Sequence, residues 1–129
     1  MKEEDALRVL KALLDREGAE WREECGWIRF RSKHGAALWE ISCRSCGEEM
    51  LFYSRFPFRC GEVEEARRRC ERLNRELVRG ALFLTEEGTP VYRCEAELDD
   101  VYNAERRIAS ALRYSAQVIV YCWGRISGI

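Results

Sequence analysis

Apolar residues recur every three or four positions in some segments of this chain and every second position in others, and the order of these segments constrains the fold most. Residues 3–17 carry apolar side chains at i, i+3 and i+4 and are followed by Gly18, so we expect a helix there. Residues 62–79 and 100–123 have the same period and predict two more helices. The last of these ends in the β-branched and aromatic run Val118–Trp123, which leaves a frayed or extended end as alternatives.

Between the helical segments, apolar and polar residues alternate, as they do along strands. Three alternating segments lie between the first and second helices, at 27–31, 37–43 and 50–56, and short connections between them favour hairpins. Two more lie at 81–85 and 91–96, on either side of a turn-rich loop. The order α-β-β-β-α-β-β-α predicts an α+β fold in which helices pack against one antiparallel sheet.

Length and charge narrow the function. A chain of 129 residues suits one domain, which we assign to residues 1–129. Its 22 basic and 23 acidic side chains give a net charge of −1, so we expect neither nucleic acid nor an anionic membrane as partner. The longest apolar run has six residues, against about 20 for a membrane span, and the N-terminus lacks the features of a signal peptide. We therefore expect a cytoplasmic protein.

One short motif has the spacing of a metal site. Cys43 and Cys46 form a CxxCG sequence at an expected hairpin tip, which is half of a zinc ribbon. A closed zinc site needs four ligands, and the other candidates, Cys25, His34 and Cys60, are each solitary. A polar turn with two incidental cysteines is therefore the favoured interpretation. We predict no metal and no cofactor, and name Cys43 and Cys46 as the ligands if a metal is bound.

The remaining polar residues suggest no catalytic site. His34, the sole histidine, lies in an expected turn with no evident residue to orient it, so a thiol enzyme is the weakest interpretation. Adjacent carboxylates such as Glu48 and Glu49 point to opposite faces of a strand and suit solvent better than acid–base work. The arginine-rich second helix carries nearly as many glutamates, which predicts a salt-bridged solvent face.

A longer stretch resembles a known family. Residues 70–84, CERLNRELVRGALFL, run into Glu86-Glu-Gly and then Tyr92-Arg-Cys-Glu-Ala-Glu-Leu. This pattern and the element order resemble YbjN-type domains, which share the type III secretion chaperone-like fold. The resemblance implies a small cytoplasmic protein, often a homodimer, with no catalytic residues to transfer. We therefore expect a non-enzymatic protein-interaction or chaperone-like domain, with a small zinc-binding module on Cys43 and Cys46 as the alternative.

Aromatic side chains off the expected apolar faces suggest where a partner binds. Seven such residues are present: Trp21, Trp27, Tyr53, Tyr102, Tyr114, Tyr121 and Trp123. On the last helix, Tyr114, Val118, Tyr121 and Trp123 form a second apolar row away from the core positions. A monomer that left this row in water would lose about 25 cal/mol for each Å² of apolar area, whereas a symmetric interface would cover it. The sequence thus predicts a homodimer through this row, unless the row folds back and completes a monomer core.

Overall fold

Three helices and six strands form the structure of residues 2–129, the part of the chain that the computed structural model describes. The elements in chain order are α1 (Glu3–Arg16), β1 (Trp21–Glu24), β2 (Trp27–His34), β3 (Ala37–Cys46), β4 (Glu49–Arg55), α2 (Val63–Asn74), β5 (Ala81–Leu84), β6 (Pro90–Glu97) and α3 (Val101–Ile126). The strands form one sheet in the order β1-β2-β3-β4-β6-β5, and every neighbouring pair is antiparallel. The predicted α+β class is confirmed.

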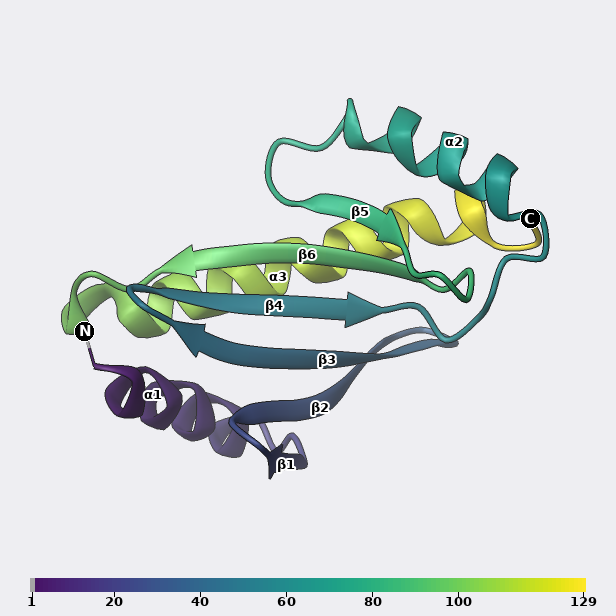
Figure 1. The fold of residues 1–129 in the computed structure, drawn as a ribbon. Coiled ribbons are helices and arrows are strands. Elements are labelled where there is room, and N and C mark those ends of the chain that lie inside the picture. The colour runs from purple at the N-terminus through teal and green to yellow at the C-terminus, as the bar shows by residue number, and fades with distance from the viewer. Residues whose placement is uncertain (1) are drawn as a thin grey trace.

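The helices cover one face of the sheet and leave the other open. In Figure 1, α3 runs behind the sheet along its length, and α1 lies at the lower left, where it contacts α3 and β3. The short helix α2 packs against β5 and the end of α3, at one edge of the sheet. No helix within residues 2–129 has a segment long and apolar enough to cross a membrane.

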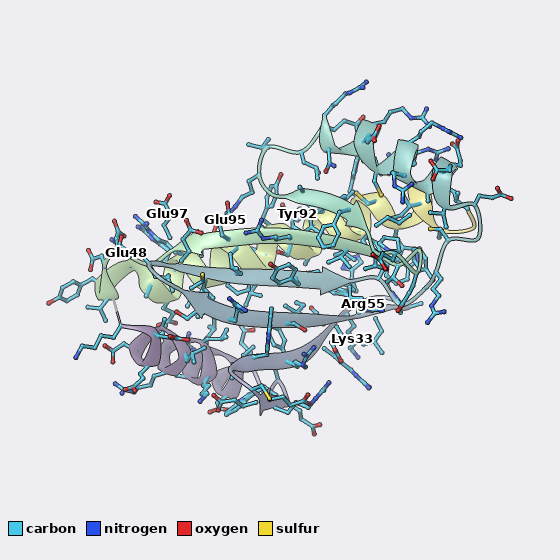
Figure 2. All side chains as sticks on the ribbon, viewed as in Figure 1. Lys33, Glu48, Arg55, Tyr92, Glu95 and Glu97 are labelled. Atoms are coloured by element: carbon cyan, nitrogen blue, oxygen red, sulfur yellow. The ribbon has the colours of Figure 1, made fainter. Side chains whose placement is uncertain are left out.

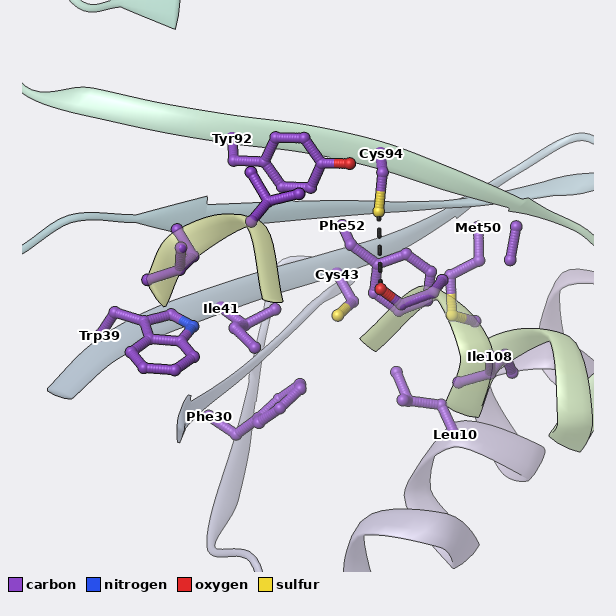
Figure 3. Packing of buried hydrophobic residues seen from close by; sticks show 14 of the residues in the cluster. Leu10, Phe30, Trp39, Ile41, Cys43, Met50, Phe52, Tyr92, Cys94 and Ile108 are labelled. Atoms are coloured by element: carbon purple, nitrogen blue, oxygen red, sulfur yellow. Dashed lines mark hydrogen bonds between the residues drawn. The ribbon is translucent and has the colours of Figure 1, made fainter. Parts of the chain in front are cut away.

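Strand register explains which residues form the core. Directly paired residues share a face of the sheet, and Ile28, Cys43, Phe52 and Cys94 lie in one row across β2, β3, β4 and β6. All four are buried, and helix residues such as Leu10 pack against this face (Figure 3). The face opposite this row therefore carries the alternate residues of the same strands.

The second helix ends five residues earlier than predicted. It stops at Asn74, and Arg75, Glu76 and Leu77 continue with i→i−3 backbone bonds. The Asn74 side chain accepts from the Leu82 N–H (2.7 Å) and donates to the Leu82 carbonyl (2.9 Å). The end of α2 is thus bonded to the outer edge of β5, a contact distant in sequence that the helical period does not reveal.

Three other boundaries correct the prediction. β1 was not predicted; its sequence, Trp21-Arg-Glu-Glu, has one apolar residue. β3 continues through Cys46, and its hairpin turns at Gly47, whose φ is +65°. α3 continues to Ile126, because the buried residues Ile119, Cys122 and Ile126 keep the helical period. The observed order is therefore α-β-β-β-β-α-β-β-α.

Candidate functional site: the open face of the sheet

The open face is the sheet surface that no helix covers, seen from the front in Figure 2. Three exposed or half-exposed apolar side chains on it are Leu38 (45 % exposed), Phe83 (40 %) and Tyr53. Its charged residues are seven basic and five acidic, a net charge of +2, although the whole chain has a net charge of −1. The basic residues are Arg22, Arg29, Arg31, Lys33, Arg44, Arg55 and Arg93, and the acidic ones are Glu24, Glu40, Glu49, Glu95 and Glu97.

A cluster of aromatic rings and guanidinium groups lies near the middle of this face. Trp27 and Tyr53 meet edge to face, with ring centroids 5.7 Å apart. The Arg44 guanidinium lies 5.3 Å from the Trp27 ring, and Arg93 lies 5.9 Å from the Tyr53 ring. The small Ser42 lies beside Tyr53 on β3, which leaves room for the two rings to meet. We call these four side chains, Trp27, Arg44, Tyr53 and Arg93, the ring–arginine cluster.

A shallow depression of about 370 Å³ adjoins this cluster. Arg29 lies in its wall, donates to the Ser42 hydroxyl (2.9 Å) and lies 3.9 Å from Glu40. The buried Nε of Arg29 has no hydrogen-bond partner within residues 2–129. The neighbouring Arg22 forms hydrogen bonds with Glu24 and Glu40, which raise the pKa of its guanidinium further above its already high ordinary value. The depression therefore has a charged wall, with Arg29, Glu40 and Arg55, beside an aromatic one.

The CxxCG motif is not a metal site in this structure. Cys43 is fully buried among core residues, whereas Cys46 is exposed on the opposite face, because positions three apart on a strand point to opposite sides. The placement of both thiols at a hairpin tip was wrong, since β3 runs through them. Across residues 2–129, no three His, Cys, Asp or Glu side chains are grouped closely enough to hold a metal ion.

The buried thiols are poor nucleophiles. Burial raises the pKa of Cys70 and of Cys122 to about 11, and it raises the pKa of Cys43 and of Cys94 as well. Ser115 shares a hydrogen bond of 3.1 Å with the Cys94 sulfur inside the core. These cysteines therefore act as small core residues.

The other charged candidates lie at the surface. His34 is exposed at the end of β2, where it pairs with Ala37. On α2, Glu65 binds Arg68 at 3.1 Å and Arg69 at 3.5 Å, as expected for a salt-bridged helix face. Arg79 does not belong to this helix face, because α2 ends at Asn74.

Most of the row expected to form a dimer packs within the chain. Val118 is buried at 4 % exposure, and Trp123 packs its ring against Phe56 and Phe58. The Tyr114 hydroxyl accepts from the Val78 N–H at 3.1 Å. Tyr121 is 41 % exposed and donates to Glu76 at 2.8 Å. The row is thus largely covered by the segments 56–58 and 75–80, and Tyr121 is its exposed member.

A known structure shares this fold. The chain is similar to a crystal structure described as YbjN, a candidate transcription regulator from E. coli, with a TM-score of 0.69 and 16% sequence identity over 92% of each chain. No family model matches the sequence. No curated protein matches it. The fold is therefore a YbjN-type fold, as the resemblance in element order and in residues 70–98 predicted.

Proposed function

We propose that this chain is a non-enzymatic protein-interaction domain whose open sheet face binds a partner protein. The ring–arginine cluster on that face is the observation that carries the proposal. Trp, Tyr and Arg are the residue types that dominate binding energy at protein interfaces. Here two aromatic rings and two guanidinium groups each lie within 6 Å of another member of the cluster. They lie on a surface that no part of residues 2–129 covers.

Charge on the open face favours an acidic partner. Arg44, Arg55 and Arg93 lie on the same face as the two rings and form no ion pair within residues 2–129, whereas Arg29 lies beside Glu24 and Glu40. The three unpaired arginines would steer an acidic surface towards the cluster. Leu38 on β3 and Phe83 on β5 supply further exposed apolar area on the same face. A partner that places carboxylates among the arginines and apolar groups over the rings would complement this surface.

Two wider parts of the proposal have separate support. The raised thiol pKa values of the buried cysteines support a non-enzymatic role, because little thiolate is present at neutral pH. All seven cysteines are free, which supports a reducing compartment such as the cytoplasm. A chaperone-like activity stays a prediction from the family resemblance, and fold alone does not determine it.

Site-specific photo-crosslinking in the source cell tests the proposal. A photoreactive residue replaces Leu38 on the open face, or Tyr102 (92 % exposed) in the first turn of α3 as the control. We expect a defined protein adduct from position 38 that the control lacks. The substitutions Arg44→Glu and Arg93→Glu should reduce that adduct at least fivefold. Equal adducts from both positions, or an adduct with nucleic acid instead of protein, would contradict the proposal.

A further inference from the structure

One side of β6 lacks a neighbouring strand over half its length. β5 pairs with β6 only from Pro90 to Arg93, whereas β6 continues to Glu97. The chain does not continue β5 backwards along this edge, because it turns away at Gly80, whose φ is +74°. The stretch 94–97 would be about 13 Å long at the usual rise of about 3.3 Å per residue. It is therefore a short sheet edge with no strand of residues 2–129 beside it.

Two arginine side chains bind the backbone at this edge. Arg79 donates to the Glu95 carbonyl (2.7 Å) and Arg107 donates to the Glu97 carbonyl (3.1 Å). In an antiparallel strand the N–H and C=O of one residue point to the same side. The N–H groups of Glu95 and Glu97 therefore point to this open edge too. The edge presents two carbonyls and two N–H groups in the pattern that a further strand requires.

A groove of about 530 Å³ lies between this edge and α3. Four arginines and two glutamates line it, with Ala96 and Ser110 between them; the charged residues are Arg79, Arg106, Arg107, Arg113, Glu95 and Glu97. The two glutamates lie on the open-face side of β6, whereas Arg106, Arg107 and Arg113 belong to α3 on the other side. Arg107 pairs with Asp99 at 3.2 Å and with Glu97 at 4.0 Å, whereas Arg106 and Arg113 form no ion pair within residues 2–129. The α3 side of the groove thus carries two cations without a carboxylate partner.

We propose that an extended acidic segment of a partner protein adds to the sheet as a strand beside residues 94–97 of β6. Residues of the segment opposite Glu95 and Glu97 exchange backbone hydrogen bonds with them and turn their side chains to the open face. The alternate residues turn their side chains towards α3, where carboxylates meet Arg106, Arg107 and Arg113. Arg79 and Arg107 leave the two carbonyls as the segment's N–H groups replace them. This inference rests on the proposed protein-interaction function and names partner chemistry for a second surface.

The competing explanation is that the arginines only protect the edge. Charged side chains on an unpaired strand commonly prevent unwanted pairing between sheets. Arg79 and Arg107 suffice for that role, because they bond the two backbone carbonyls, of Glu95 and Glu97, that β5 leaves without a strand partner. Arg106 and Arg113 donate to no backbone carbonyl of residues 2–129, and edge protection gives no reason for their place in the groove. Charge complementarity with a carboxylate-bearing strand accounts for all four.

Fluorescence anisotropy with synthetic peptides tests the inference on the full chain. The probe is a labelled hexapeptide in which Thr and Glu alternate, and the charge control alternates Thr and Lys. Two further probes carry N-methyl groups, on the threonines in one and on the glutamates in the other. When the glutamates face α3, the threonine N–H groups point at β6 and the glutamate N–H groups point to solvent. The two methylated probes therefore separate strand pairing from simple charge attraction.

We expect saturable binding of the Thr-Glu probe and none of the Thr-Lys probe. Methylation of the threonines should weaken binding at least tenfold, and methylation of the glutamates less than threefold. The double variant Arg106→Glu/Arg113→Glu should weaken binding at least tenfold. Its matched control, Arg8→Glu/Arg67→Glu, changes two exposed arginines on α1 and α2 and should leave binding unchanged. Circular dichroism verifies that each variant is folded.

Three outcomes would overturn the inference. Absence of Thr-Glu binding leaves edge protection as the role of the arginines. Equal binding of both methylated probes means an acidic ligand without strand addition. Tighter binding of a twelve-nucleotide oligothymidine that displaces the probe assigns the groove to nucleic acid. None of these results alters the crosslinking expected from Leu38 on the open face, so the two proposals fail separately.

Discussion

Replacement of Asn74 by Ala should loosen β5 from α2 and destabilise the protein by about 2–4 kcal/mol. The Asn74 amide makes two hydrogen bonds to the backbone of Leu82, at 2.7 Å and 2.9 Å, and Leu82 is 3 % exposed. Each hydrogen bond contributes about 1 kcal/mol net, and a buried group left without a partner costs about 1–3 kcal/mol. Both groups of Leu82 lose their partner at once, which gives the stated range. That is a large share of a typical stability of about 5–15 kcal/mol.

The assay is urea unfolding combined with hydrogen exchange. Asn74→Ala should lower the unfolding midpoint, and the Leu82 amide should exchange faster than the amides of β3. The matched control is Asn103→Ala, because within residues 2–129 the Asn103 side chain bonds only to the side chains of Asp100 and Arg106. We expect that control to change stability by less than about 0.5 kcal/mol. Equal effects of the two substitutions would refute the reasoning.

Three further outcomes follow from burial and from the exposed end of α3. Cys46 should react with a thiol reagent much faster than Cys43, as mass spectrometry at short times would show; equal rates would mean that β3 frays. The free energy of unfolding should fall as pH rises from about 9 to about 11, because Cys70 and Cys122 have a folded pKa of about 11 against an ordinary 9.0 and so bind more protons in the folded state. Ala at both positions should flatten that slope in pH-dependent urea unfolding. Because most of the expected row packs within the chain, Val120 and Tyr121 (40 % and 41 % exposed) remain for self-association through the C-terminal end of α3. If a dimer forms there, Tyr121→Glu should weaken it in sedimentation at micromolar concentration, whereas a species of about 15 kDa unaffected by Tyr121→Glu would exclude it.

Periodicity predicted most elements because each helix and central strand has one buried face. The strand β1 was not predicted, because its sequence Trp-Arg-Glu-Glu buries little side-chain area and has no alternation of apolar and polar residues. The end of α2 was wrong for another reason. Leu77 continues the helical period, but the bonds between Asn74 and Leu82 divert the chain first. That contact belongs to the tertiary structure and leaves no local signal.

The open face was predictable in its parts and not as a whole. Trp27 and Tyr53 were both among the aromatics expected off the core, yet they come from different strands. Their meeting depends on the register of β2, β3 and β4, which hairpin lengths fix only after the turn positions are known. The same error in turn position placed Cys43 at a hairpin tip, although its alternation with Trp39 and Ile41 matched a core position. The net charge of −1 also did not predict the basic excess on the open face, because the net charge of a chain does not show how charged residues are distributed between the two faces of its sheet.

The pairing of β4 with β6 has a consequence for how the chain folds. β1 to β4 pair with their neighbours in sequence through short turns, as do β5 and β6, so these hairpins can form early and locally. β4 and β6 are joined across α2 and β5; Met50 pairs with Ala96, and Phe52 pairs with Cys94. Closing that long loop costs entropy before the contact is gained. We therefore expect pairing of β4 with β6 to form later than the hairpins, and mutations there should slow refolding less than they speed unfolding if this is so.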